Sequence, residues 1–145
     1  MKLHKTLALA LAISGLPFVA QARDTTHYLN FQQVVQEALD AGRLDGSVKF
    51  YLGYTPAGAK IVSRGLTTSK KTNAFGKSDE NACAWVLQSA LIHLQESAKR
   101  RGANAVTNLV SNYQHREFKS RDQYECHAGG IMAGVALKGD FANVR

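Results

Sequence analysis

Residues Ser78 to Ser111 read SDENACAWVLQSALIHLQESAKRRGANAVTNLVS, and this stretch decides the fold. Ser78 is a favourable N-cap, two acidic residues follow it, and three basic residues precede Gly102, which are the signals that begin and end a helix. An alternating segment, Ala105 to Ser111, comes directly after the turn and is typical of a strand. We therefore predict a long helix joined tightly to a strand, as the central unit of an α+β domain.

The predicted helix has one face of small and apolar side chains. At about 100° per residue these side chains fall into a single stripe that we expect to lie on a sheet. The stripe consists of Cys83, Leu87, Ala90, Leu91, Leu94 and Ala98. Trp85 and Ile92 fall on nearly the opposite side of the helix. They are predicted either to form a contact surface or to be covered by a second element.

The N-terminal segment has the pattern of a secretory signal peptide. Lys2 and Lys5 precede an apolar run at 7–19, and Ala20-Gln21-Ala22 matches the small-x-small cleavage pattern. The run of about 13 residues is shorter than a bilayer-spanning helix. We predict a signal peptide at 1–22, cleaved after Ala22, and a single α+β domain at 23–145. The protein is then periplasmic without a stable membrane anchor, and release from the cell is left open.

The charge of the chain bears on its partners. The net charge is +7, and loss of Lys2 and Lys5 with the signal peptide leaves +5. Outside the cytoplasm, a basic protein meets anionic headgroups, lipopolysaccharide phosphates and cell-wall carboxylates. Aromatic residues are not interleaved with the basic clusters, and no helix resembles a groove binder. We predict a protein partner or an anionic envelope component, and no nucleic acid.

The segments before the long helix predict a short helix, two strands and a loop. Asn30 is the expected N-cap of a helix that ends near Gly42, and strands are expected at 47–52 and 59–64. Residues 65–77 are rich in Gly, Thr, Ser, Lys and Asn, which predicts a long loop of the kind that compact domains keep for binding. The candidate ligand-contacting residues in this loop are Lys70, Lys71, Asn73, Phe75 and Lys77.

After the central unit, residues 112–122 form a polar connection, and residues 123–138 return through the sheet. Before Gly129-Gly130 the less polar residues stand at even-numbered positions, and after it the bulky apolar residues stand at odd-numbered positions. A glycine β-bulge would shift the parity while both halves of the strand keep facing the same core. We therefore predict one long bulged strand here.

The two cysteines are predicted to form a disulfide. Cys83 lies on the apolar stripe of the helix and Cys126 on the core-facing side of the last strand, so both point into one layer. The alternative is a metal site that combines both thiols with histidines. The histidines considered are His93 and His115, with His27 and His127 as further members. They lack the spacing of common zinc motifs, so no metal or other cofactor is predicted.

The sequence offers little for catalysis. Phe75-Gly76-Lys77-Ser78 imitates the end of a phosphate-binding loop, but Lys71 stands where the first glycine of that motif belongs. There is no Gly-x-Ser-x-Gly elbow and no convincing carboxylate pair. We therefore predict a non-enzymatic protein.

Three segments carry a resemblance to known proteins: Asn73 to Leu91, Ala98 to Val106, and Tyr124 to Gly139. They resemble small exported proteobacterial proteins of unknown function, some of which carry the label "excinuclease ATPase subunit". They are also similar to YbjQ-type domains and to RcsF-like envelope-stress domains. The resemblance implies a small antiparallel sheet packed on the long helix, a helix-to-strand disulfide, a homo-oligomer, and a binding or accessory role in envelope homeostasis or stress. The chain departs from RcsF-like domains because it lacks a lipidated cysteine and a second cysteine pair.

Overall fold

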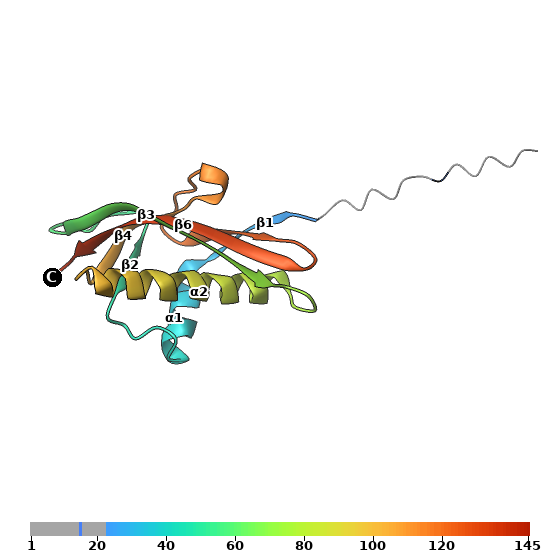
Figure 1. Ribbon diagram of the computed structural model, residues 1–145, viewed down its shortest axis with the longest axis horizontal. Coiled ribbons are helices and arrows are strands. Elements are labelled where there is room, and N and C mark those ends of the chain that lie inside the picture. Colours follow the sequence, from blue (N-terminus) through green and yellow to red (C-terminus); the bar gives the residue numbers. More distant parts are fainter. Residues whose placement is uncertain (1–14, 16–22) are drawn as a thin grey trace, which may run out of the picture.

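The computed structural model describes residue 15 and residues 23–145. The predicted signal peptide lies outside the described residues except for Gly15. The chain forms a curled sheet with two α-helices, so the broad α+β class is confirmed (Figure 1). The elements in chain order are β1 (Thr25–Asn30), α1 (Phe31–Asp40), β2 (Lys49–Leu52), β3 (Lys60–Asn73), α2 (Asp79–Arg100), β4 (Ala105–Ser111), the 3-10 turn η1 (Tyr113–His115), β5 (Gln123–Ala128) and β6 (Met132–Asn143).

Strand β6 organises the sheet. One of its edges pairs with β3 from Met132 to Asn143, while its other edge pairs first with β5 and then with β4. Strand β1 pairs antiparallel with β5, and β2 pairs parallel with β4. The prediction of an antiparallel sheet is therefore wrong for one pair. The parallel pair arises because β3 and α2 form the long crossover that parallel neighbours require.

The two helices begin where their caps predict. The Ser78 hydroxyl accepts a hydrogen bond from the Asn81 N–H at 3.2 Å, and the Asn30 side chain accepts one from the Gln33 N–H at 2.9 Å. All six stripe residues of α2 are buried, and α2 runs along β3 and β6 (Figure 1). Phe31 and other apolar residues of α1 belong to the same hydrophobic cluster.

The predicted loop at 65–77 is wrong for most of its length. Strand β3 continues from Lys60 to Asn73, and only the turn at 74–78 separates it from α2. The strand forms because β6 offers it a continuous partner along its backbone, and because threonine, frequent in this segment, suits a pleated surface. Its polar composition reflects its place as an edge strand, where lysines discourage unwanted pairing.

The predicted bulge at Gly129-Gly130 is also wrong. These residues form the turn of a hairpin between β5 and β6, closed by a hydrogen bond from the Gly129 N–H to the Met132 carbonyl at 2.7 Å. A turn that reverses the chain can also change which alternate residues face the core, so the shift in parity does not require a bulge. Strand β1 was not predicted, because its partly buried positions are Thr25, His27 and Leu29, which do not form an apolar alternation in the sequence.

The two faces of the sheet differ. Helix α2 covers one face, and residues 112–122, which include η1, lie on the opposite, outer face (Figure 1). Among the described residues, no helix combines the length and apolar character needed to cross a bilayer.

Candidate functional site

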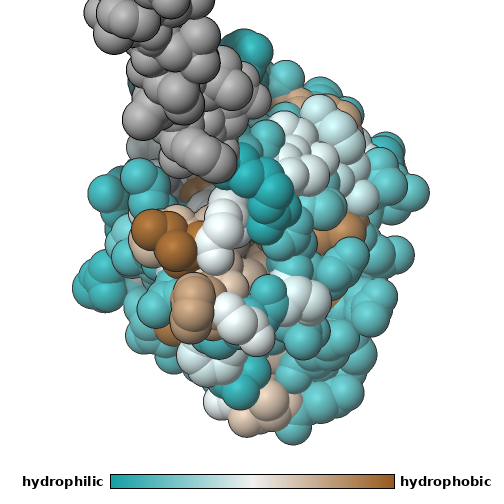
Figure 2. All heavy atoms as spheres, turned by 90° about the vertical axis from the view of Figure 1, so that its right-hand side faces the viewer, coloured by the Kyte–Doolittle hydropathy of each residue, from teal (hydrophilic) through white to brown (hydrophobic). Residues whose placement is uncertain are grey.

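A cavity of about 680 Å³ opens on the outer face, where the β5–β6 hairpin turns. We call it the hairpin-end pocket. It is lined by Arg23, Asp24, Lys71, Tyr113, His127 and the hairpin residues Gly129 to Gly134. Open pockets with an apolar lining and a few convergent polar groups are the usual form of ligand sites. Figure 2 looks onto this end of the molecule and shows apolar side chains gathered on it.

The floor of the pocket is one row of the sheet. Gly134 of β6 pairs with His127 of β5 on one side and with Lys71 of β3 on the other. Paired residues project from the same face, so the His127 and Lys71 side chains flank a position without a side chain. A Cβ atom on Gly134 would lie 3.4 Å from the Lys70 carbonyl oxygen, which is ordinary contact. The glycine thus leaves space between a cation and an aromatic ring.

The His127 ring is held rigidly. Its Nε2 lies 2.9 Å from a Glu125 carboxylate oxygen, and its Nδ1 lies 3.2 Å from a carboxylate oxygen of Asp24. Its face stacks on Tyr113 with ring centroids 3.5 Å apart and an interplanar angle of 13°. Both ring nitrogens therefore face carboxylates of the protein. In this arrangement, His127 serves as a fixed wall of the pocket.

Tyr113 is placed by a tight turn. Gln114 and His115, which follow it, both have positive φ angles, 53° and 61°. Residues other than glycine adopt this left-handed conformation only where the surroundings enforce it. The Asn112 N–H donates to the Ala136 carbonyl at 2.8 Å, which fastens the start of the turn to β6. The turn therefore presents Tyr113 over the outer face.

Arg23 closes the side of the pocket nearest β1. Its guanidinium donates to the Asp79 carboxylate at 2.7 and 2.9 Å and to the Gly129 carbonyl at 3.0 Å. His27 Nε2 lies 2.8 Å from the same carboxylate. The hydrogen bonds from Arg23 and then His27 hold the pKa of Asp79 well below its usual range. Asp79 thus neutralises Arg23, and Lys71, which makes no ion pair among the described residues, is the free cation of the pocket.

Three large apolar side chains project beside the mouth of the pocket. Phe75 is 75% exposed, Ile131 66% and Met132 43%. The turn at 74–78 and the hairpin turn carry them side by side, because the Ala74 N–H donates to the Ile131 carbonyl at 2.8 Å and Asn73 pairs with Met132. We call Phe75, Ile131 and Met132 the apolar tip. Ile131 and Met132 also line the pocket, so its rim is apolar.

The structure separates the residues of the predicted ligand loop. Lys71 and Asn73 pair with outer-face positions of β6, whereas Lys70 projects to the opposite face, where its charge acts on His93 of α2. Phe75 and Lys77 are exposed in the turn at 74–78. Only Lys71 of these five residues lines the hairpin-end pocket.

The predicted disulfide is present. The Cys83 and Cys126 sulfur atoms are bonded, and their Cα atoms lie 5.9 Å apart. The alternative metal site would need both thiols, which the bridge consumes. His93 lies on the helix side, with its Nδ1 2.8 Å from the Thr68 hydroxyl, while His115 belongs to η1 on the outer face. Residues 23–145 contain no group of three or more His, Cys, Asp or Glu side chains arranged to hold a metal.

The two residues of the predicted contact pair on α2, Trp85 and Ile92, differ in exposure. Trp85 is 46% exposed, and the Arg43 guanidinium lies 4.6 Å from its ring centroid. Ile92 is partly buried against the hydrophobic cluster. Arg43 therefore covers part of the surface that Trp85 would present, and a partner for this pair stays a prediction.

Comparisons with protein-family models, with curated proteins and with solved structures found no match to this chain. The resemblance to YbjQ-type and RcsF-like domains stays a prediction.

Proposed function

We propose that this chain is an exported, non-enzymatic binding protein whose hairpin-end pocket holds an amphipathic molecule with an anionic group. The observation that carries the proposal is the row of Lys71, Gly134 and His127, which leaves an open floor between a free cation and a fixed ring. An apolar or aromatic body would lie over Gly134 against Tyr113, and its acidic group would lie at Lys71.

The character of the lining supports an amphipathic ligand over a purely ionic one. Hairpin residues Ile131, Met132 and Ala133 line the cavity, and Arg23 is already neutralised by Asp79. A small polyanion would find a single free cation, whereas a ligand with an apolar body gains burial on this wall. The pocket therefore favours molecules such as acyl or aromatic acids.

A non-enzymatic role is supported by the state of His127. Its two nitrogens lie beside Glu125 and Asp24, and no serine, threonine or cysteine lines the pocket as a nucleophile. General acid–base work needs a ring nitrogen within reach of the substrate. Binding without turnover is the simpler use of this geometry.

The proposed compartment is the periplasm, and the proposed role is an accessory one in envelope homeostasis or stress. The signal-peptide pattern at 1–22 supports export, and a disulfide suits an oxidising compartment. Amphipathic acids are abundant at the envelope as products and precursors of lipids. A pocket with one cation and an apolar rim fits that chemistry.

The test uses two fluorescent probes of similar size. Anilinonaphthalene sulfonate carries an anionic group, and phenylnaphthylamine does not. We expect both to brighten on binding, with the sulfonate binding more tightly. Lys71→Gln should weaken binding of the sulfonate probe by about tenfold, since a charge-assisted contact contributes about 1–2 kcal/mol. The affinity for the neutral probe should be nearly unchanged. Gly134→Leu should abolish binding of both probes, because its side chain fills the floor.

The control is Ser69→Leu, which adds the same bulk on the same face of β3, two residues before Lys71 and outside the lining of the pocket. This variant should bind both probes like the unaltered protein. Matching thermal melts for all variants separate loss of binding from loss of fold. If Gly134→Leu binds both probes as tightly as the control, the pocket is not the ligand site.

A further inference from the structure

We propose that the apolar tip docks on the surface of an anionic lipid bilayer, so that the hairpin-end pocket opens at the membrane. This inference stands on the tip and on the chain that leads to it. It does not depend on the ligand proposed for the pocket.

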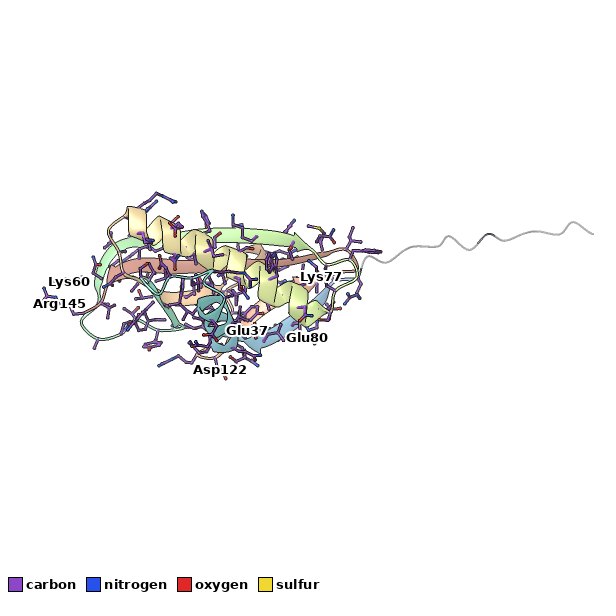
Figure 3. All side chains as sticks on the ribbon, turned by 90° about the horizontal axis from the view of Figure 1, so that it is seen from below. Glu37, Lys60, Lys77, Glu80, Asp122 and Arg145 are labelled. Atoms are coloured by element: carbon purple, nitrogen blue, oxygen red, sulfur yellow. A yellow bond between two sulfur atoms is a disulfide. The ribbon has the colours of Figure 1, made fainter. Side chains whose placement is uncertain are left out.

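Half of the large apolar side chains exposed in the described structure lie in the tip. Six such residues are exposed, and Phe75, Ile131 and Met132 are three of them. They project at the end of the β3–β6 ribbon, at the same end of the molecule as Lys77 in Figure 3. A few bulky residues on two adjacent turns form a wedge, whereas a stable protein interface needs a broad surface. The shape of the patch therefore fits insertion between lipid headgroups.

The preceding chain brings this end of the molecule to a membrane. The apolar run at 7–19 is separated from Arg23 only by residues 20–22, which span at most about 10 Å when extended. Arg23 donates to the Gly129 carbonyl in the hairpin turn, so it lies at the tip. A signal peptide at 1–22 that is inserted in the bilayer would keep residue 23 near the bilayer surface until it is cleaved, and a domain that has folded by then would have its tip there. The other end of the molecule faces away.

The charges around the tip favour an anionic leaflet. Lys71 and Lys77 make no ion pair among the described residues. The Asp79 carboxylate is paired with Arg23, the Asp24 and Glu125 carboxylates both lie against the His127 ring, and Glu80 makes no ion pair among the described residues. Lysines close to an apolar wedge attract anionic headgroups, and salt weakens that attraction. Docking should therefore be tighter at low ionic strength.

A tryptophan placed at the tip tests the proposal directly. Trp85 is the only tryptophan of the chain, so the Trp85→Phe variant has no tryptophan fluorescence of its own. In that background, Phe75→Trp puts an indole on the tip, and Val62→Trp puts one at an exposed position far along β3. Each protein is prepared from the same cellular fraction, with intact mass showing the same N-terminus. It is then mixed with phosphatidylethanolamine–phosphatidylglycerol vesicles whose acyl chains carry bromine.

We expect the indole introduced at position 75 to shift its emission to shorter wavelength and to be quenched by the brominated chains. The indole introduced at position 62 should show neither effect. Without either tryptophan substitution, Phe75→Ser should weaken sedimentation with the vesicles by about tenfold, the loss expected for one aromatic side chain, while Val62→Ser should not. Vesicles of phosphatidylcholine alone should bind the unaltered protein and the Val62→Ser variant more weakly than the anionic vesicles do.

Three results would overturn the proposal. The first is equal quenching at positions 62 and 75, and the second is no quenching at either. The third is an emission shift at position 75 that appears without lipid as the protein dimerises in sedimentation, because the tip would then bind a second copy. Phe75 does not line the pocket, so Phe75→Ser should still bind anilinonaphthalene sulfonate. Loss of vesicle binding with the probe retained separates this proposal from the proposed ligand site.

Discussion

Cys83 in the first turns of α2 is bonded to Cys126, which lies in the middle of β5 beside His27 of β1. The bridge therefore joins the helix to the β1–β5 pair. That pair is attached to the rest of the sheet by only two residue pairs of the hairpin, His127 with Gly134 and Ala128 with Ala133. The disulfide and the ion pair of Arg23 with Asp79 thus hold an arm that backbone pairing alone would hold weakly.

Replacing both cysteines with alanine should destabilise the protein and loosen this arm first. Closing 43 residues stabilises the fold by about 4 kcal/mol on the chain-entropy model, so the free energy of unfolding should fall by about that amount. Amide hydrogen exchange in β1 and β5 should rise more than exchange in β3. Urea denaturation and exchange mass spectrometry measure the two effects. Uniform acceleration over all strands would contradict the view of β1–β5 as a separate arm.

Asp79→Asn should lower stability at neutral pH and remove part of the sensitivity to acid. The pKa of Asp79 is below the usual 3.8 because Arg23 and His27 hydrogen-bond its carboxylate. A folded-state pKa below the unfolded one means that the stabilisation is complete above about pH 4 and is lost as the pH falls further. Denaturation at pH 7 and at about pH 3 should therefore show a larger difference for the unaltered protein than for the variant.

The control for this prediction is Glu80→Gln, which removes the next carboxylate along the helix. Glu80 makes no ion pair among the described residues. Its loss should change the stability at neutral pH much less than the loss of Asp79. Equal effects of the two substitutions would show that helix-end charge, and not the contact with Arg23, is what Asp79 contributes.

Gly53→Ala should be much more harmful than Gly58→Ala. Both glycines have similar positive φ angles, +75° and +80°, so each substitution costs about 1–2 kcal/mol of backbone strain. A Cβ atom on Gly53 would also meet the Ser120 carbonyl oxygen far inside contact distance, whereas nothing lies within 4 Å of the same atom on Gly58. The overlap should add about 1–3 kcal/mol. Equal midpoints of denaturation would show that residues 112–122 move aside freely.

Lys70→Gln should raise the pKa of His93, and Lys71→Gln should not. The pKa of His93 is lowered from 6.5, first by desolvation and then by the charges of Lys70 and Arg100. Adjacent residues of β3 project to opposite faces, so Lys71 lies across the sheet from the ring. Because the folded-state pKa of this histidine is lowered, stability is lost in the unaltered protein as the pH falls through the ordinary value of 6.5. An NMR titration of the ring protons measures the shift in each variant.

The helix and the disulfide could be predicted because their signals are local. Ser78 and Gly102 mark the ends of the helix, and its stripe shows which way Cys83 points. Strand β3 could not be recognised in the same way, since Leu66 to Asn73 lacks an apolar alternation and becomes a strand through its pairing with β6. The frequent threonines were the available signal, and they were outweighed by the lysines and by the expectation of a loop.

Only part of the candidate site could be predicted from the sequence. Alternation along β5 puts His127 on the face opposite Cys126, but the sequence suggested His127 only as a further member of the alternative metal site. The pocket exists because distant segments meet there: Lys71 from β3, Tyr113 from η1 and Arg23 from the start of the domain. Registers between strands decide which residues become neighbours, and a single sequence does not contain them.

The position of Arg23 also decides how the protein should be handled in binding assays. Its side chain is fastened to Asp79 and Gly129, while Arg145 lies at the opposite end of the molecule (Figures 1 and 3). An affinity tag fused ahead of residue 23 would emerge beside the pocket and obstruct it. A tag after Arg145, captured on a sensor surface, would turn the pocket and the apolar tip outward toward the analyte.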